Sequence, residues 1–270
     1  MTVRSTITVL ALTVGGVPEG CMAARPTTTP NYEQLAAEYE ARFEVIDDEA
    51  WLDLIREYVS RFRALAEAQP SSPDAGESLA WIATHAVESQ DIESALPRLI
   101  DDYVDEPYML DVCAKLSDQF HSFAAAGLDA VVARARNPSI STGARFFRAR
   151  HELRVAKAVR DLRDDRTRAP TESQWTQVPE EMVRWLDSLD PSALQFDGEH
   201  SLESLAASAD DIRYQGRTIA DLARSTLYEI RDLAVGRPAP EITGEDVDGA
   251  PLSLSQFRGR VVVLDFWGNW

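Results

Sequence analysis

Residues 51–65, WLDLIREYVSRFRAL, carry the clearest periodic pattern in the chain. Their apolar side chains recur three or four residues apart: Trp51, Leu54, Ile55, Tyr58, Val59, Phe62 and Leu65. In a helix, this spacing places all of them on one face. The pattern therefore predicts an amphipathic helix. Its aromatic stripe is expected to be buried core rather than a binding platform, because burial of such stripes holds helical domains together.

The same period extends in both directions from this helix. Upstream, residues 31–43 place Tyr32, Leu35, Tyr39 and Phe43 on one face. Further helical stretches follow near 79–87, 91–104, 108–123, 127–136, 144–163, 179–189, 201–213 and 217–234. No β-like alternation of useful length precedes residue 235, and no repeat of fixed period is visible. Residues 31–234 are predicted to form a mostly α, acidic domain of about nine short helices arranged as hairpins.

The charge balance limits the classes of partner. The 270 residues hold 45 Asp and Glu against 27 Lys and Arg, for a net charge of −18. Binding to nucleic acid or to an anionic membrane needs a concentrated positive surface, which this balance opposes. With 44% hydrophobic and 27% charged residues, the chain has the composition of a globular protein.

Cysteine and histidine are too sparse for a metal centre. Cys21 and Cys113 are the two cysteines, too few for a disulfide scaffold or a thiolate zinc site. The histidines lie in separate segments: His85, His121, His151 and His200. None has a second His or Cys three or four residues away, so no metal and no cofactor is predicted. Cys113 lies between apolar residues of a helix and is expected to be buried and unreactive.

Residues 1–24 have the pattern of a signal peptide, with Arg4, an apolar stretch over 7–17 and small residues at 23–24. Residues 25–30 then form a linker. This pattern favours a periplasmic or other extracytoplasmic location, with the cytoplasm as the alternative. A lipid anchor at Cys21 is disfavoured, because Pro18 and Glu19 stand where a lipoprotein signal has aliphatic and small residues.

The sequence changes in character at residue 235. Segments 242–247 and 251–254 are predicted to pair as a β-hairpin around Asp248-Gly249, a dipeptide suited to positive φ angles. The continuous apolar run Val261–Trp267 is typical of a central strand buried on both faces of an α/β sheet. Asp265 interrupts that run. A carboxylate in a buried strand is costly, and this marks Asp265 as a candidate functional residue.

Four motifs in this region match one family pattern. They are Gly236-Arg237-Pro238-Ala239-Pro240, Asp246-Val247-Asp248-Gly249, Leu254-Ser255-Gln256-Phe257-Arg258-Gly259-Arg260 and Asp265-Phe266-Trp267-Gly268-Asn269-Trp270. Together they resemble the start of a thioredoxin-like domain of the TlpA/ResA branch. The resemblance covers residues 235–270 only and is silent on the helical region. It implies an incomplete thioredoxin-like α/β domain, of which only the first hairpin and central strand are present.

The resemblance implies a thiol-disulfide oxidoreductase that acts on protein thiols or disulfides or with a reductase partner. In the family, the residue after the F-W-x-x-W motif is the nucleophilic first cysteine of C-x-x-C, so the nucleophile is expected just after Trp270. Asp265 corresponds to the buried acid that assists proton transfer at the resolving cysteine. Trp267, Gly268, Asn269 and Trp270 would flank the site; packing alone equally accounts for the tryptophans.

Two other functions remain open. Peroxiredoxin-like antioxidant enzymes share the A-P and D-G opening, although their strand leads into a different loop. A non-enzymatic helical interaction protein with a vestigial redoxin segment is the second alternative. The 270-residue chain is expected to lack dithiol-disulfide activity. One hypothesis for its end at Trp270 is a UGA selenocysteine codon read as a stop; a contig end, a frameshift and a true nonsense mutation are the others.

Overall fold

The computed structural model describes residues 31–47, 50–165 and 178–265. The chain divides into two compact units, which are described separately below. One spans Thr29–Pro238 and is called the helical unit; the other includes residues 239–265 and is called the C-terminal unit. The predicted signal peptide (1–24), linker (25–30) and Cys21 lie outside the described residues. Among the residues that are described, no helix has both the length and the apolar character to cross a membrane.

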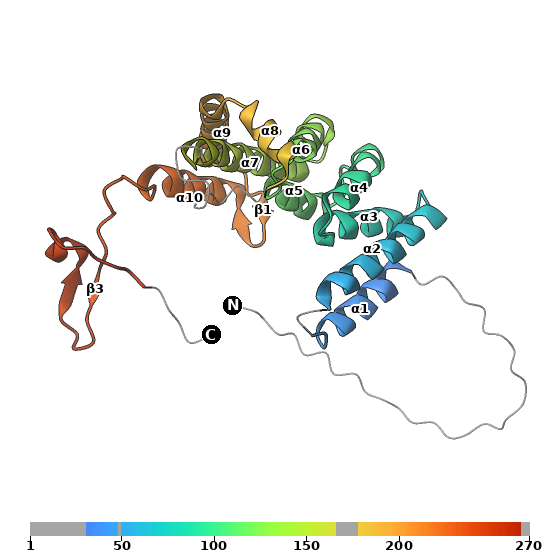
Figure 1. Ribbon diagram of the computed structural model, residues 1–270, viewed down its shortest axis with the longest axis horizontal. Helices are drawn as coiled ribbons and strands as arrows, with labels where there is room; N and C mark the ends of the chain where they lie inside the picture. The colour runs from blue at the N-terminus through green and yellow to red at the C-terminus, as the bar shows by residue number, and fades with distance from the viewer. Residues whose placement is uncertain (1–30, 48–49, 166–177, 266–270) are drawn as a thin grey trace, which may run out of the picture. The chain divides into compact units, whose positions relative to one another are not determined.

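The helical unit has ten α-helices within the described ranges (Figure 1), close to the number expected. Their bounds are α1 (Tyr32–Phe43), α2 (Trp51–Ala68), α3 (Pro73–His85), α4 (Ser89–Asp102), α5 (Met109–Ser117), α6 (Ser122–Arg134), α7 (Pro138–Asp165), α8 (Glu180–Asp187), α9 (Pro191–Ala206) and α10 (Ile219–Asp232). Proline begins α3, α7 and α9, where its missing N–H costs no helical hydrogen bond. The mostly helical fold is thus confirmed.

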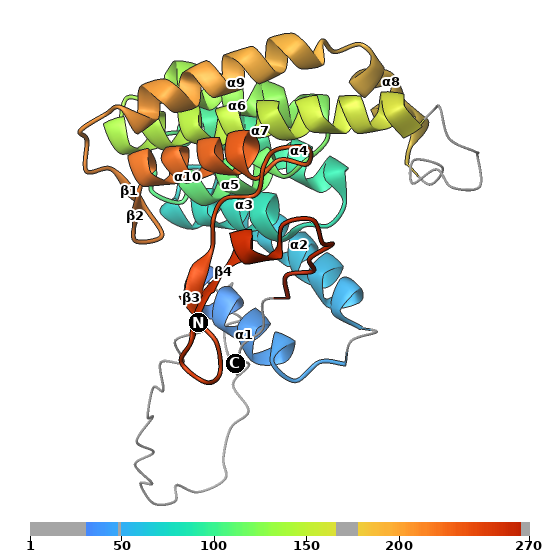
Figure 2. The ribbon, with the colours of Figure 1, turned by 90° about the vertical axis from the view of Figure 1, so that its left-hand side faces the viewer.

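The helices pack in two layers. Helices next to each other in the chain form pairs: α1 with α2, α3 with α4, and α5 with α6, while α7 pairs with α9. The first members of the pairs also contact one another, from α1 through α3 and α5 to α7, and α7 contacts α10 (Figure 1, Figure 2). We call α1, α3, α5, α7 and α10 the inner layer. Each inner helix thus has an outer partner and an inner neighbour.

The predicted aromatic stripe is core. Tyr58 and Phe62 of α2 are completely buried, and Trp81 of α3 stacks on Phe62 with ring centroids 4.3 Å apart. Burying side chains of this size contributes about 1.5–3 kcal/mol each. Two residues depart from the prediction: Phe43 and Trp51 are 44% and 39% exposed, because they lie at the ends of α1 and α2 beyond the contact between the two helices.

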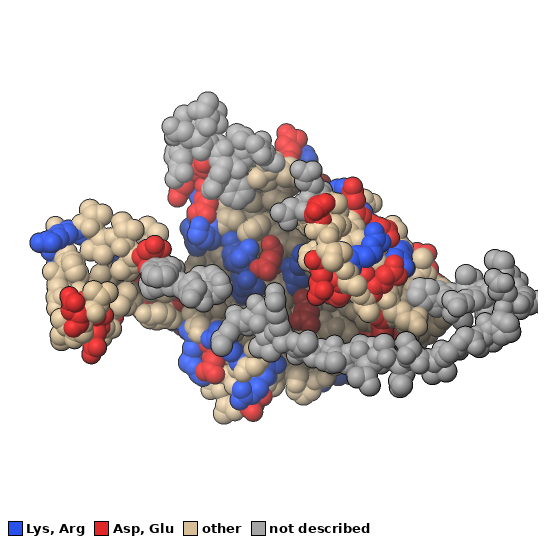
Figure 3. Space-filling view, turned by 90° about the horizontal axis from the view of Figure 1, so that it is seen from below, with Lys and Arg blue, Asp and Glu red and all other residues tan. Residues whose placement is uncertain are grey.

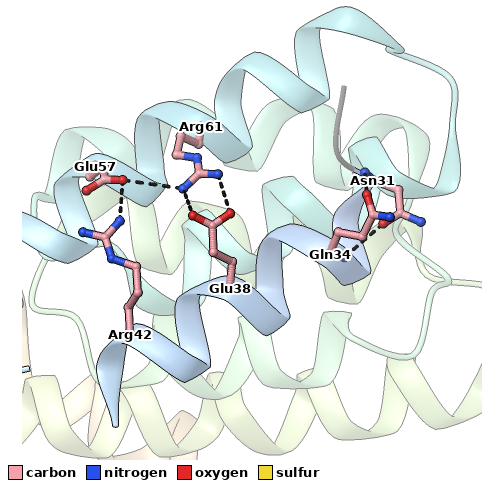
Figure 4. Close-up of polar contacts among 6 residues, drawn as sticks. All are labelled: Asn31, Gln34, Glu38, Arg42, Glu57 and Arg61. Carbon is pink, nitrogen blue, oxygen red and sulfur yellow. Dashed lines mark hydrogen bonds and ion pairs between the residues drawn. The ribbon is translucent and has the colours of Figure 1, made fainter. Parts of the chain in front are cut away.

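Side-chain contacts define the start of α1 and join it to α2 (Figure 4). Asn31 and Gln34 form a reciprocal capping box, in which each side chain accepts the other residue's backbone N–H. Both oxygens of Glu38 accept from the Arg61 guanidinium at 2.7 Å. These hydrogen bonds lower the pKa of Glu38 to about 2. Arg42 Nη1 donates a single hydrogen bond to Glu57 Oε1 at 2.7 Å.

The sequence did not predict one element of the helical unit. Where a helix was expected to end near 213, β1 (Arg213–Tyr214) and β2 (Arg217–Thr218) form a small antiparallel hairpin. Gln215 and Gly216 have φ angles of +48° and +81°, as a two-residue type I′ turn requires. Strands of two residues are too short for a visible alternation of polar and apolar side chains.

In the C-terminal unit, β3 (Thr243–Glu245) pairs antiparallel with β4 (Pro251–Ser253), and the 3-10 helix η2 (Leu254–Phe257) follows. The predicted hairpin is confirmed. The described part of the predicted central strand, residues 261–265, does not form a strand, and it is exposed, as expected for a strand whose neighbours are missing. A central strand needs a hydrogen-bonded neighbour on each side. Strands β3 and β4 pair only with each other, and the described residues of this unit contain no further strand.

Candidate functional site

The loop of the C-terminal hairpin is organised by Asp246. Its Oδ1 accepts hydrogen bonds from the backbone N–H groups of Asp248 and Ala250, each at 2.9 Å. The Asp246 N–H in turn donates to the Ala250 carbonyl at 2.9 Å. Gly249 has φ +79°, a conformation in which a side chain would be strained. The first Asp of the D-x-D-G motif therefore shapes the loop, and Gly249 allows the backbone to turn.

A second set of contacts joins the hairpin to η2. The Glu241 carboxylate accepts from the Ser255 N–H at 2.9 Å, and the Leu254 N–H donates to the Ile242 carbonyl at 2.9 Å. The hydrogen bonds from Ser255 lower the pKa of Glu241. Gly259, with φ +82°, then redirects the chain toward residue 261. The L-S-x-F-x-G-R motif thus forms the turn that was expected at 256–259.

Of the predicted site residues, only Asp265 lies in the part of the chain that the structure describes. Asp265 is exposed, so the burial that the resemblance implies for its carboxylate is absent among the described residues. The residues before it are exposed as well, with Val261 at 97% and Val263 at 86%. The reason is that no packed layer among the described residues covers this segment. Trp267, Gly268, Asn269 and Trp270 lie outside the described residues.

Cys113 is the described cysteine, and it is completely buried in the helical unit. Burial raises the pKa of its thiol to about 12. Since the thiolate is the nucleophilic form, this thiol is unreactive at neutral pH. The expectation that Cys113 is a buried apolar residue is confirmed.

The helical unit has a cleft that the sequence did not reveal, with a volume of about 400 Å³. It lies along the inner layer, and we call it the α1–α3–α5 cleft. The residues that line it are Tyr32, Glu77, Ala80, Trp81, Thr84, His85, Tyr108 and Asp111. Aromatic and acidic side chains predominate among them. Within the described residues that line this cleft, there is no lysine or arginine.

Close packing fixes two walls of the cleft. A Cβ at Gly76 would stand 2.2 Å from the Tyr108 hydroxyl, so only glycine lets this tyrosine approach α3. The His85 ring stacks parallel on Trp81 with centroids 4.5 Å apart. Its Nδ1 donates to the Trp81 carbonyl at 3.0 Å. Gly76 lies before the helical stretch predicted at 79–87, so the sequence pattern did not indicate this close approach.

A second cleft of about 330 Å³ continues along the inner layer, between α7, the β1–β2 hairpin and α10. Phe147, Arg150, Tyr214, Arg217 and Glu229 are among its lining residues. The Tyr214 hydroxyl donates to Asp111 Oδ1 at 2.9 Å. Because Asp111 lines the first cleft and Tyr214 the second, this hydrogen bond marks their common border. We call this second hollow the α7–α10 cleft.

Nine arginines in the described part of the helical unit form ion pairs between helices. Arg56 pairs with Glu88 at 2.9 Å, Arg63 with Asp91 at 2.6 Å, and Arg231 with Glu199 at 2.6 Å. Viewed from below, the helical unit shows basic side chains next to acidic ones (Figure 3). In the ranges that the structure covers, no three His, Cys, Asp or Glu side chains are grouped to hold a metal ion.

Comparison with protein-family models, with curated proteins and with solved structures found no match for this chain.

Proposed function

We propose that residues 235–270 are the opening of a thioredoxin-like thiol-disulfide oxidoreductase domain, and that the helical unit docks its protein partner. The observation that supports the redox proposal most is that two of the four sequence motifs form the local structures expected of them. The D-x-D-G motif forms the loop between β3 and β4, held by Asp246, and the L-S-x-F-x-G-R motif forms the turn that follows. Both lie in the order and spacing that the resemblance implies.

The chemistry of such a domain is disulfide exchange. A thiolate, expected just after Trp270, attacks one sulfur of a substrate disulfide and releases the other sulfur as a thiolate. The resolving thiol of the same domain then attacks the mixed disulfide, which frees the reduced substrate and leaves a disulfide in the enzyme. Neither step can be carried out by Cys113, because its thiol is buried and protonated.

Asp265 is the residue of the described chain proposed to assist this exchange. In a completed α/β domain, neighbouring strands would pair with residues 261–265 and helices would cover the faces of the sheet, which would bury the Asp265 carboxylate. Burial raises the pKa of a carboxyl group, so a buried Asp265 could exchange a proton with the resolving thiol near neutral pH. Its role is therefore conditional on the burial of the strand.

The alternative of a non-enzymatic interaction protein is favoured by one observation. The helical unit has its own hydrophobic core, in two clusters, and two clefts along one layer, all without the C-terminal unit. Such a module can bind a partner without any redox chemistry. The redox proposal and the docking proposal are thus separable by experiment.

The redox proposal can be tested by extending the chain. The part of a TlpA-type domain that begins at its C-x-x-C motif is joined directly after Trp270, and reduction of insulin disulfides is measured with dithiothreitol as reductant. We expect turnover, and we expect Asp265→Asn to lower the rate by about tenfold or more. Asp248→Asn, an exposed acid of the hairpin loop, serves as the matched control and should leave the rate unchanged. A folded extension without turnover, or equal rates for both variants, would contradict the proposal.

A further inference from the structure

We infer that the α1–α3–α5 cleft binds the guanidinium group of an arginine side chain that belongs to a partner protein. The inference rests on the docking role proposed above for the helical unit. It does not depend on the redox chemistry proposed for residues 235–270.

Glu77 is the anion that such a ligand would pair with. It lies half-buried in the cleft wall, and the described part of the chain gives its carboxylate no hydrogen-bond or ion-pair partner. Burial raises the pKa of Glu77, and the neighbouring acids Asp74, Glu33 and Glu106 raise it further. A partly buried carboxylate among other acids is costly to leave unpaired. A cation in the cleft would remove this cost.

The two tyrosines of the cleft are in the same negative field. Burial is the main cause that raises the pKa of Tyr32, followed by the charges of Glu77 and Glu40. The pKa of Tyr108 is raised in the same way, first by burial and then by Glu106. The charged groups that raise the pKa of these two tyrosine hydroxyls are therefore acids. This contrasts with the rest of the unit, where arginines neutralise acids across the helix contacts.

His85 adds a neutral acceptor. Its Nδ1 donates to a carbonyl oxygen, which requires the proton to be on Nδ1 and leaves Nε2 as an acceptor. Burial lowers the pKa of His85; the charge of Lys115 lowers it further, while the hydrogen bond to Trp81 and the charge of Glu40 oppose the shift. A neutral imidazole does not repel a cation. The cleft thus offers hydrogen-bond acceptors of three kinds: carboxylate oxygens, an imidazole nitrogen and phenol oxygens.

This donor-poor, aromatic surrounding suits guanidinium better than ammonium. A guanidinium group is planar, carries five N–H donors and stacks on aromatic rings. Tyr32 and Tyr108 supply rings from two different helical segments, and Glu77 and Asp111 supply carboxylates. A cation over a tyrosine ring gains about 0.5–2 kcal/mol. The cleft's volume of about 400 Å³ is within the range of small-molecule pockets and is large enough to admit an arginine side chain.

The continuation of the cleft favours a polypeptide over free arginine. Across the Tyr214–Asp111 hydrogen bond lies the α7–α10 cleft, with Arg150 and Arg217 among its lining residues. Arg150 is already paired with Asp118 at 3.0 Å, whereas Arg217 has no ion-pair partner among the described residues. An extended segment with arginine in the first cleft could therefore place an acidic residue beside Arg217. Free arginine would use only the first cleft. Charge complementarity therefore points to a protein segment with a basic and then an acidic residue.

Binding to the 270-residue chain is measured by fluorescence anisotropy. The probe is a short labelled Gly/Ser peptide with one arginine and one glutamate, and its counterpart has neutral citrulline in place of arginine. We expect saturable binding of the arginine peptide and binding weaker by roughly tenfold or more for the citrulline peptide. Glu77→Gln should weaken arginine binding by a similar factor. Glu67→Gln, which makes the same charge change on an exposed face of α2, should change it less than about twofold.

Three results would overturn the inference: no saturable binding, equal affinity for arginine and citrulline, or equal losses in Glu77→Gln and Glu67→Gln. Competition by free L-arginine as strong as that by the unlabelled peptide would also overturn it, because the ligand would then be a small molecule. Tyr32→Leu is the second variant and should weaken binding several-fold through loss of the ring. Thermal melting of each variant verifies that the fold is intact. Failure here leaves insulin reduction by the extended chain unaffected, so the two proposals fail separately.

Discussion

Glu152 and His151 are neighbouring buried side chains of α7 whose pKa values are shifted strongly. Burial raises the pKa of Glu152 to about 7, although Arg148 opposes the shift. Burial lowers the pKa of His151 to about 4, assisted by the charges of Arg154 and Arg148 and opposed by the charge of Asp129. Both residues therefore favour their neutral forms in the folded state. Nothing in the sequence indicated this, because a His-Glu pair in a helix gives no sign of its burial.

The raised pKa of Glu152 predicts a stability that falls with rising pH. The folded protein holds this proton more tightly than the unfolded chain, so the contribution is complete below pH 4.5 and is lost as the pH rises through about 7. Glu152→Gln removes the effect. We expect the variant to gain about 1–3 kcal/mol relative to the wild type between pH 5 and pH 8 in urea unfolding. A difference between the two proteins that stays constant with pH would contradict this account.

At the scale of single elements, sequence periodicity predicted most helices but not their ends. Helix α3 begins at Pro73, six residues before the first residue of the predicted stretch 79–87, because Ser72 caps it and Pro73 suits the first turn. Helix α7 likewise extends over Pro138–Asp165, beyond the predicted 144–163. Helix ends depend on single capping contacts, whereas helix interiors depend on a pattern summed over many residues.

The capping box of α1 gives a prediction for this element. Asn31→Ala removes the acceptor for the Gln34 N–H, so we expect a loss of about 1 kcal/mol and faster hydrogen exchange in the first turn of α1. Asn31→Asp keeps the acceptor and is the matched control. Exchange rates that are the same in both variants would show that the cap does not stabilise the helix.

For the whole molecule, the features of the C-terminal unit could be predicted from the sequence more completely than the clefts of the helical unit. The C-terminal motifs are local, so the hairpin and the turn at 256–259 could be predicted from neighbouring residues. The α1–α3–α5 cleft could not, because Tyr32, Glu77 and Tyr108 meet only when three helices pack. The same holds for the arginine pairs: Arg61 and Glu38 are distant in the chain and touch only across the α1–α2 contact.

The proposed redox function depends on the exposed residues 261–265. The apolar residues Val261 and Val263 are almost fully exposed, which is unusual for a sequence that predicts a buried strand. We interpret the run as a central strand whose neighbours come from the remainder of a thioredoxin-like domain. If so, its backbone amides should become protected when those neighbours are supplied.

The most direct measurement is hydrogen–deuterium exchange of residues 261–265 in the 270-residue chain and in the chain extended by the TlpA-type segment. Exposed, unpaired amides exchange rapidly, whereas amides of a central strand open only with the domain. We expect rapid exchange in the 270-residue chain and strong protection in the extended chain. Rapid exchange of 261–265 in an extended chain whose added segment is itself folded and protected would contradict it.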